Sequence, residues 1–299
     1  MRHIVPVVIL SLVLSLTSLA PSAAQDASPV AGRAGHGALA DMGYPELHIT
    51  VYDDHFQVQG MVPSGRTLIV YENVGQESRH SLLVRLPDGL DLSDPAMREE
   101  SEDAPPSWFF DSRFVGFPGE TSPGETSYAV VDLEPGIHVL FDDFNASFIV
   151  GGPLPTDIPA GPDASGSVEL FDFSFTLPEA VLPGQQVWEV TNTSEQPHEL
   201  LLVYSPGPVT VDQVLEALDS EDSEIELTPA GGVGWLSPGQ TAWTEIDLQP
   251  GTYVALCFVY DPSTGMSHAM MGMVTVFTVA EAGEPGEAAT PDTSDSYDY

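Results

Sequence analysis

The chain contains two copies of one unit, and this repeat restricts its possible folds more than any other feature. One stretch reappears without a gap: residues 122–136 read SPGETSYAVVDLEPG and residues 237–251 read SPGQTAWTEIDLQPG, a shift of 115 positions. Further matches, at a shift of 119, pair Asp53, Phe56 and Gly65 with Asp172, Phe175 and Gly184, and His80 also matches His198. Self-similarity of this kind indicates two similar modules in tandem.

The repeat divides the chain into domains. We expect the first domain to occupy residues 45–150 and the second to occupy residues 167–280, lengths that suit two small domains. Between them, residues 151–166 are rich in Gly, Pro and Ser and show no apolar periodicity, which is typical of a linker.

Both repeats alternate apolar and polar residues with a period of two, the pattern of a β-strand with one buried face. In residues 241–248, for example, Ala242, Ile246 and Leu248 share one face while Asp247 lies on the other. Short strands of this kind, separated by Ser-Pro-Gly and Gln-Pro-Gly turns, predict an all-β fold of two tandem Greek-key β-sandwiches.

Each domain is also predicted to carry one short helical insertion after the strand that follows the repeated histidine. In the second domain, Thr210 and Gln213 form a capping box ahead of an apolar helix face. In the first domain, Ser93 or Asp94 caps a turn that Pro95 opens.

The N-terminal residues predict export. Arg2 precedes an uncharged apolar run over residues 4–20, and the small residues before Gln25 fit the site that a signal peptidase reads. We therefore expect residues 1–24 to be a cleaved signal peptide, which leaves no integral membrane segment and places the protein outside the cytoplasm, secreted, at the cell surface or in a periplasm. An uncleaved anchor is the alternative, because the run approaches membrane-spanning length.

Two further segments are expected to lack fixed structure. Residues 25–44 form a flexible N-terminal segment. Residues 281–299 form an acidic tail that is too poor in large apolar groups to offset the entropy of ordering, so we expect it to be disordered.

The chain is strongly acidic. It contains 45 Asp and Glu against 7 Arg and no Lys, for a formal net charge of −38. This charge argues against nucleic acid and anionic lipid as partners. Two explanations of the acidity remain open: a solvated surface suited to a salty exterior, or an acidic face that docks a basic partner protein.

The chemistry of the second domain centres on Cys257, the only cysteine. No intramolecular disulfide is possible, and a free thiol in an exported protein oxidises unless it is buried or ligated. The ordinary alternative is a small core residue. However, His268 and Met273 follow in a loop between two strands, and His198 begins an earlier strand. Two His, one Cys and a weakly bound axial Met form a set that suits copper cycling between two oxidation states.

In these motifs the second domain resembles the cupredoxins, the plastocyanin and azurin family of type 1 blue copper proteins. The residues that carry the resemblance stand in family order: Asn192, Pro197-His198, Pro250-Gly-Thr-Tyr253, Cys257, His268 and Gly272-Met273. The resemblance implies one copper ion per chain, with His198, Cys257 and His268 as equatorial ligands and Met273 as the axial ligand. It also implies that electrons enter through a solvent-facing edge of His268.

The loop from Cys257 to His268 departs from the plastocyanin pattern, since it is longer and nearer in length to that of the copper nitrite reductases. It contains three further methionines, Met266, Met270 and Met271. These compete with Met273 for the axial position or pack around the site, and we prefer Met273 because its spacing from His268 fits the family.

The first domain lacks this pattern. Asp142 stands at the position of Cys257, and the loop that would carry the remaining ligands is missing. We predict no type 1 copper site there, and His80 alone is a weak candidate ligand. The expected role of this domain is structural, either to cover the second domain or to present a surface for assembly.

These features predict an electron carrier with no small-molecule substrate. Its partner is expected to be a redox protein, and a basic one if the acidic surface is a docking face. We expect no enzyme activity, because no His-x-His pair is present to build the second copper site of an oxidase or nitrite reductase. Two alternatives remain: an extracytoplasmic copper(I) carrier, store or sensor, which the soft thioethers of the methionines favour, and a metal-free surface scaffold.

Overall fold

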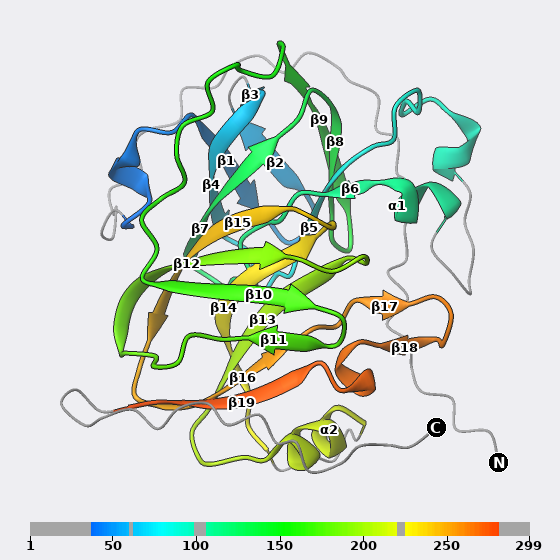
Figure 1. Cartoon of the computed structure of the whole chain (residues 1–299). Coiled ribbons are helices and arrows are strands. Elements are labelled where there is room, and N and C mark those ends of the chain that lie inside the picture. The colour runs from blue at the N-terminus through cyan, green and yellow to red at the C-terminus, as the bar shows by residue number, and fades with distance from the viewer. Residues whose placement is uncertain (1–36, 60–61, 99–105, 220–224, 281–299) are drawn as a thin grey trace.

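The computed structural model describes residues 37–59, 62–98, 106–219 and 225–280. The predicted signal peptide and the acidic tail lie outside these residues. Strands make up most of the regular secondary structure in the described residues, and the helices are short (Figure 1). None of the helices in the described part of the chain combines the length and the apolar character that a membrane span requires.

The first unit contains nine strands in two sheets. The strands are β1 (Glu46–Val51), β2 (Phe56–Gln59), β3 (Val62–Pro63), β4 (Gly65–Asn73), β5 (Leu82–Arg85), β6 (Arg113–Phe114), β7 (Thr126–Leu133), β8 (Gly136–Phe141) and β9 (Asn145–Gly151). One sheet contains β2, β1, β4 and β7, and the other contains β3, β9, β8, β5 and β6. The 3₁₀ turn η2 (Pro95–Arg98) and the helix α1 (Ser107–Asp111) lie between β5 and β6.

The second unit repeats this plan. Its strands are β10 (Gly166–Phe171), β11 (Ser174–Thr176), β12 (Gly184–Asn192), β13 (His198–Ser205), β14 (Thr228–Leu236), β15 (Thr241–Leu248), β16 (Gly251–Leu256), β17 (Tyr260–Asp261), β18 (Met266–Ser267) and β19 (Val274–Val279). One sheet contains β11, β10, β12 and β15, another contains β14, β13, β16 and β19, and β17 pairs with β18 as a small hairpin. The helix α2 (Val211–Asp219) follows β13, and the 3₁₀ turn η3 (Ala269–Met271) precedes β19.

The all-β fold of two sandwiches is therefore confirmed, as are the helical insertions. The predicted alternation appears in β15, where Ala242, Ile246 and Leu248 are buried and Asp247 is exposed. Apolar faces of this kind from both units join in one buried cluster. The capping box of α2 also forms, since the Gln213 side chain accepts a hydrogen bond from the Thr210 backbone and Gln213 N–H donates to the Thr210 hydroxyl.

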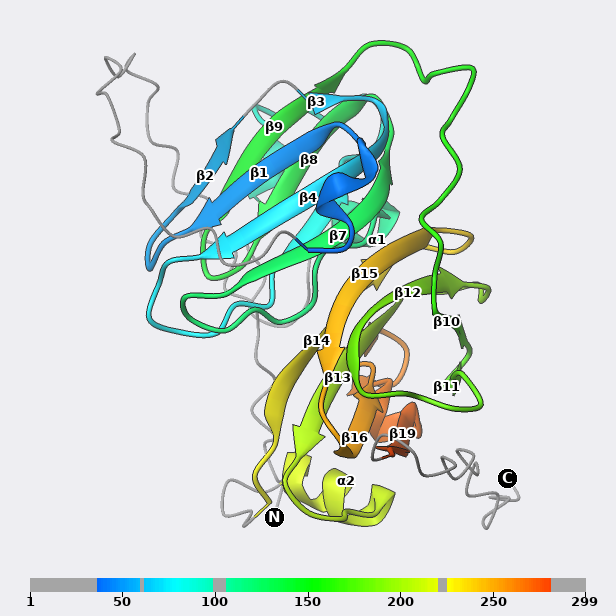
Figure 2. The ribbon, with the colours of Figure 1, turned by 90° about the vertical axis from the view of Figure 1, so that its left-hand side faces the viewer.

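The two units share a sheet, which the sequence did not predict. Strand β15 pairs with β7, so the strands run in the order β11, β10, β12, β15, β7, β4, β1, β2 across both units. Figure 2 shows this run from β1 through β4 and β7 to β15 and β12. The order is the same from either end, because each strand on one side is the repeat of its counterpart on the other.

The contacts at the junction obey the same symmetry. Thr244 pairs with Ala129, and these two residues are equivalent at the shift of 115. A second set of hydrogen bonds joins Gly119 N–H to the Gly232 carbonyl at 3.0 Å and Gly234 N–H to the Phe117 carbonyl at 2.8 Å. These bonds also exchange equivalent residues, so an approximate two-fold axis relates the two units.

The residues that flank the first unit pack against this junction. Residues 37–44, the described part of the N-terminal segment predicted to be flexible, contain the 3₁₀ turn η1 (Ala40–Met42). Leu39 is fully buried in a cluster that contains residues from both units: Leu68, Val130, Val187 and Trp243. Residues 152–165, between the last strand of the first unit and the first strand of the second, form neither helix nor strand.

Candidate metal centre

Two neighbouring strands and one loop bring the predicted ligands together. His198 is the first residue of β13, and Cys257 directly follows β16. Because these strands are antiparallel, with Leu201 opposite Leu256, the start of one and the end of the other meet at the same end of the sheet. His268 comes from the loop that follows Cys257.

The loop folds back on itself and so returns His268 to the thiol. Its hairpin, β17 and β18, turns at a tight bend in which the Asp261 carboxylate accepts hydrogen bonds from Ser263 and Thr264 N–H. At the base of the loop, His268 N–H donates to the Val259 carbonyl at 2.8 Å, and the next N–H donates to the Cys257 carbonyl at 2.7 Å. These two hydrogen bonds connect the backbone at His268 to the backbone at Cys257.

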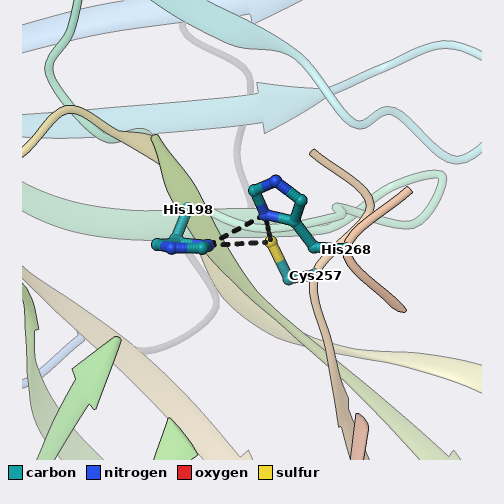
Figure 3. A group of neighbouring side chains, drawn as sticks. All are labelled: His198, Cys257 and His268. Atoms are coloured by element: carbon teal, nitrogen blue, oxygen red, sulfur yellow. Dashed lines mark hydrogen bonds between the residues drawn. The ribbon is translucent and has the colours of Figure 1, made fainter. Parts of the chain in front are cut away.

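The three side chains point toward one another (Figure 3). Cys257 Sγ lies 3.7 Å from His198 Nδ1 and 3.5 Å from His268 Nδ1, and the two Nδ1 atoms lie 2.9 Å apart. All three residues are at most 1% exposed. In the described residues, this is the one group of three or more His, Cys, Asp or Glu side chains whose ligand atoms lie close enough together to hold a metal ion.

The spacing fits a trigonally bound metal ion with one adjustment. Bonds of about 2.0 Å to nitrogen and about 2.3 Å to sulfur, the lengths that zinc shows, would place sulfur about 3.7 Å from each nitrogen in a trigonal plane, and the nitrogens about 3.5 Å apart. The two sulfur distances agree with these values. The nitrogen pair is closer, at a hydrogen-bond distance, and would open by about half an ångström. Two imidazoles and one thiolate are the donor set that suits copper.

The surroundings of the group keep the imidazoles neutral, as metal ligation requires. Burial, and then the neighbouring His268, lowers the pKa of His198 to about 4. Burial also lowers the pKa of His268. For Cys257 the effect is opposite, because burial raises the pKa of the thiol well above its ordinary value and the nearby Glu199 carboxylate raises it further. A bound cation would offset this cost and favour the thiolate.

The four methionines of the loop region lie in different environments. Met273 is fully buried in the same apolar cluster as Cys257, and its N–H donates to the His268 carbonyl at 2.9 Å. Met266 and Met270 are more than 40% exposed, and Met271 is half-buried. Burial next to the ligand group is consistent with the preference for Met273, whose axial role stays a prediction.

The solvent-facing edge of His268 that the family resemblance implied is absent, because the residue is buried. The turn between β10 and β11 contacts both imidazoles. Phe173 packs edge-on against the His268 ring, with centroids 5.1 Å apart, and Asp172 Oδ1 lies 3.6 Å from His198 Nε2. Phe173 adopts a left-handed backbone conformation with φ of 58°, which is unfavourable for a bulky residue and is typical of functional sites.

The chain is similar to several solved structures of copper proteins. No family model and no curated protein matches the chain. Auracyanin from the photosynthetic bacterium Roseiflexus castenholzii is 24% identical over 38% of this chain and 95% of its own, with a TM-score of 0.25. Auracyanin B is 18% identical over 41% and 94%, with a TM-score of 0.27. Copper nitrite reductase from Nitrosomonas europaea is 14% identical over 82% and 96%, with a TM-score of 0.23.

The assignment of the fold rests on the strands and on the ligand group themselves. A β-sandwich gathers His198 from the start of one strand, Cys257 from the end of its neighbour and His268 from the following loop, all buried at one end of the sheet. The second unit is a cupredoxin-like domain.

The first unit has the same cupredoxin-like framework, but its residues at the site are different. Leu82 pairs with Phe141 as Leu201 pairs with Leu256, and this register makes Leu82 equivalent to Leu201. Counting back three residues from each places Arg79, not His80, at the position of His198. The sequence match of His80 with His198 was therefore off by one position.

An ion pair fills the corresponding place in the first unit. The buried Arg79 guanidinium lies 3.4 Å from Asp142 and 3.0 Å from the exposed Asp143. The Asp142 carboxylate also accepts a hydrogen bond from the Ser81 hydroxyl at 2.7 Å. Arginine and aspartate thus stand where the second unit has His198 and Cys257.

Glu199 is a residue near the site that sequence reasoning missed. It is fully buried, it directly follows His198, and its Oε1 accepts a hydrogen bond from Phe258 N–H at 2.7 Å. Phe258 is the residue after Cys257. A carboxylate ahead of the apolar run at residues 200–203 was the available signal, because Glu is almost never buried without a partner.

Proposed function

We propose that this protein is a secreted type 1 copper protein that carries single electrons between redox partners. The buried group of His198, Cys257 and His268 carries the proposal, because its donor set and spacing suit one copper ion. The export signal predicted over residues 1–24 supports an extracytoplasmic location.

When bound, copper supplies a one-electron couple. The surrounding backbone holds the ligand side chains in one arrangement. Cys257 provides the thiolate, His198 and His268 provide neutral imidazoles, and Met273 is the candidate for a weak fourth ligand. Backbone hydrogen bonds from Ala269 N–H to Cys257 and from His268 N–H to Val259 fix the loop. Ligands that cannot rearrange serve electron transfer, since both oxidation states must share similar geometry.

The path for electrons differs from the one that the family resemblance implied. His268 is buried and Phe173 is half-buried against its ring, so we propose that a partner approaches through the turn that carries Phe173. The partner is a redox protein, and the net charge of −38 favours one with a basic docking surface. We propose no enzyme activity, since the ligand group of the second unit is suited to a single metal ion.

The first test is a copper(II) titration of the full mature chain, followed by visible absorption and electron paramagnetic resonance, beside a Cys257→Ser variant. We expect an intense thiolate-to-copper band that saturates at one copper per chain and is absent from the variant. A wild-type protein that stays colourless with full copper supply would overturn the proposal and leave a copper(I) carrier or a metal-free scaffold.

A copper(I) carrier is the second candidate, favoured by the exposed thioethers of Met266 and Met270 beside the ligand loop. Cyclic voltammetry separates the two functions. An electron carrier keeps its metal through repeated oxidation and reduction, whereas a carrier of copper(I) releases the ion in one of the two states.

A further inference from the structure

The Glu199 carboxylate links the ligand group to the first unit. One oxygen, Oε1, accepts the Phe258 N–H at 2.7 Å and so holds the backbone next to Cys257. The other oxygen, Oε2, lies 3.0 Å from Nε2 of His80 in the first unit. That oxygen is buried and accepts no hydrogen bond from the described residues, so its contact with His80 is an ion pair by distance. Leaving a buried carboxylate oxygen without this partner would be strongly unfavourable.

The position of this contact follows from the two-fold arrangement of the units. His80 and Glu199 are equivalent residues, one place after Arg79 and His198 in the register of the strands. Equivalent residues meet at a two-fold axis. Two identical units would therefore bring two histidines or two glutamates together here, and only the divergence of the copies creates a complementary pair.

The electrostatics of His80 agree with an ion pair. Burial by itself would lower the pKa of His80, but the Glu199 carboxylate, with smaller contributions from Glu120 and Asp142, raises it by more. The net pKa is therefore raised. The His80 side chain keeps 30% of its surface exposed, whereas Glu199 has none. The first unit thus supplies a partner for a charge that the second unit buries beside its thiol.

We infer that His80 of the first unit is a positioning residue for the metal centre of the second unit, acting through Glu199 on the backbone that carries Cys257. This inference rests on the proposed copper site. It gives the first unit a role in the electron-transfer centre beyond covering it. Removing the His80 cation would leave the Glu199 charge uncompensated near the thiolate, which stabilises the more positive oxidised metal and lowers the reduction potential.

The test compares His80→Gln with His48→Gln in the full mature chain loaded with copper. His48 is a matched control, because it is a histidine of the same unit that contacts a carboxylate, Glu46 of its own strand, and both side chains are exposed. We expect both variants to bind one copper with a thiolate band, His80→Gln to have a lower reduction potential and an altered paramagnetic spectrum, and His48→Gln to match the wild type. An unchanged potential and spectrum in His80→Gln would overturn the inference.

A failure of the proposed function looks different, because the wild type itself would then show no thiolate band. A measurement without metal keeps the inference testable in that case or if His80→Gln loads copper poorly. In urea unfolding of the metal-free chain, Glu199→Gln removes the charge, and we expect the cost of His80→Gln to shrink in the Glu199→Gln background. Costs that add independently would contradict the contact.

Discussion

The two units place different chemistry at the same end of the same sheet. In the second unit, His198 and Cys257 face each other across neighbouring strands, and in the first unit Arg79 and Asp142 do so. Each pair satisfies polar groups that would be costly to bury alone. This end of the sandwich therefore accommodates either an ion pair or a histidine–cysteine pair. The third group, His268, is what extends the second pair to a possible set of metal ligands.

That third group depends on the length of one connection. In the first unit, Phe141 pairs with Asn145, so residues 142–144 close the turn between β8 and β9. In the second unit, Leu256 pairs with Val274, and residues 257–273 occupy the same connection. The longer segment holds Cys257, His268 and the candidate axial ligand, so all candidate ligands except His198 come from this one connection.

The largest effect is expected from converting the second unit to the pair of the first. The double variant His198→Arg with Cys257→Asp should lose the thiolate-to-copper band completely, because it lacks the thiolate and one of the two imidazoles. It should still fold, since the same pair is accommodated at the equivalent place in the first unit. Visible absorption and circular dichroism measure the two outcomes, and an unfolded variant would break the comparison.

The reciprocal exchange is the control for this prediction. Arg79→His with Asp142→Cys installs two potential ligands in the first unit, where the short turn of residues 142–144 provides no third. We expect no additional thiolate-to-copper band, and a second band would show that the insertion is unnecessary.

A large loss of stability is expected from Asp142→Ala. The substitution leaves the buried Arg79 guanidinium with only the exposed Asp143 as an ion partner, and breaking such a buried pair costs about 3–5 kcal/mol. Urea unfolding of the metal-free protein measures the loss. Asp143→Ala is the matched control, because that side chain is 75% exposed and its removal should cost at most about 1 kcal/mol. Equal losses in the two variants would contradict the buried pair.

A pH-dependent loss is expected from His138, which occupies the place of Tyr253 in the second unit. Burial lowers the pKa of His138 from its ordinary value of 6.5 to about 4. Between pH 6.5 and 4, the His138 side chain is protonated in the unfolded chain and neutral in the folded chain. Its contribution to the free energy of unfolding is therefore complete above pH 6.5 and is lost as the pH falls toward 4. The loss reaches about 3 kcal/mol.

His138→Tyr removes this dependence by introducing the residue of the second unit. The difference in unfolding free energy between the wild type and His138→Tyr should change with pH over the range from 6.5 to 4, in favour of the variant at the acidic end. His55→Tyr makes the same substitution at an exposed position of the same unit and is the control for the introduced tyrosine. A constant difference for His138→Tyr would mean that the buried histidine is not the cause.

The smallest effect is expected at a position where the two units should lose the same amount of stability. Asn73 and Asn192 are equivalent, and each side-chain amide donates to two backbone carbonyls, at 2.8 and 2.9 Å in the first unit and at 2.8 and 2.7 Å in the second. Substitution of either by Ala should cost about 2 kcal/mol, because buried carbonyls lose their donors. Urea unfolding of each variant measures the two costs, and a difference above about 1 kcal/mol would show that the turns are not interchangeable.

The sequence predicted the sandwich fold through its period-two strands, which are local signals. The grouping of His198, Cys257 and His268 came from the resemblance to the cupredoxins, and the structure brings these three residues together. The sequence could not align His80, because identity of residue type favoured a match that the pairing of Leu82 with Phe141 rules out. The burial of His268 depends on Phe173, which lies on a distant turn. The contact of His80 with Glu199 depends on how the units meet, and no periodicity within one unit encodes that.

The shared sheet has a consequence for assembly. Separated from each other, the two units would expose β7 and β15 as open edges, which are templates for pairing with other chains. In the tandem chain, residues 152–165 keep the matching edge at a high effective concentration, so the pairing is intramolecular. The protein is thus the covalent equivalent of an isologous dimer, and dilution that would dissociate two free subunits leaves its interface intact.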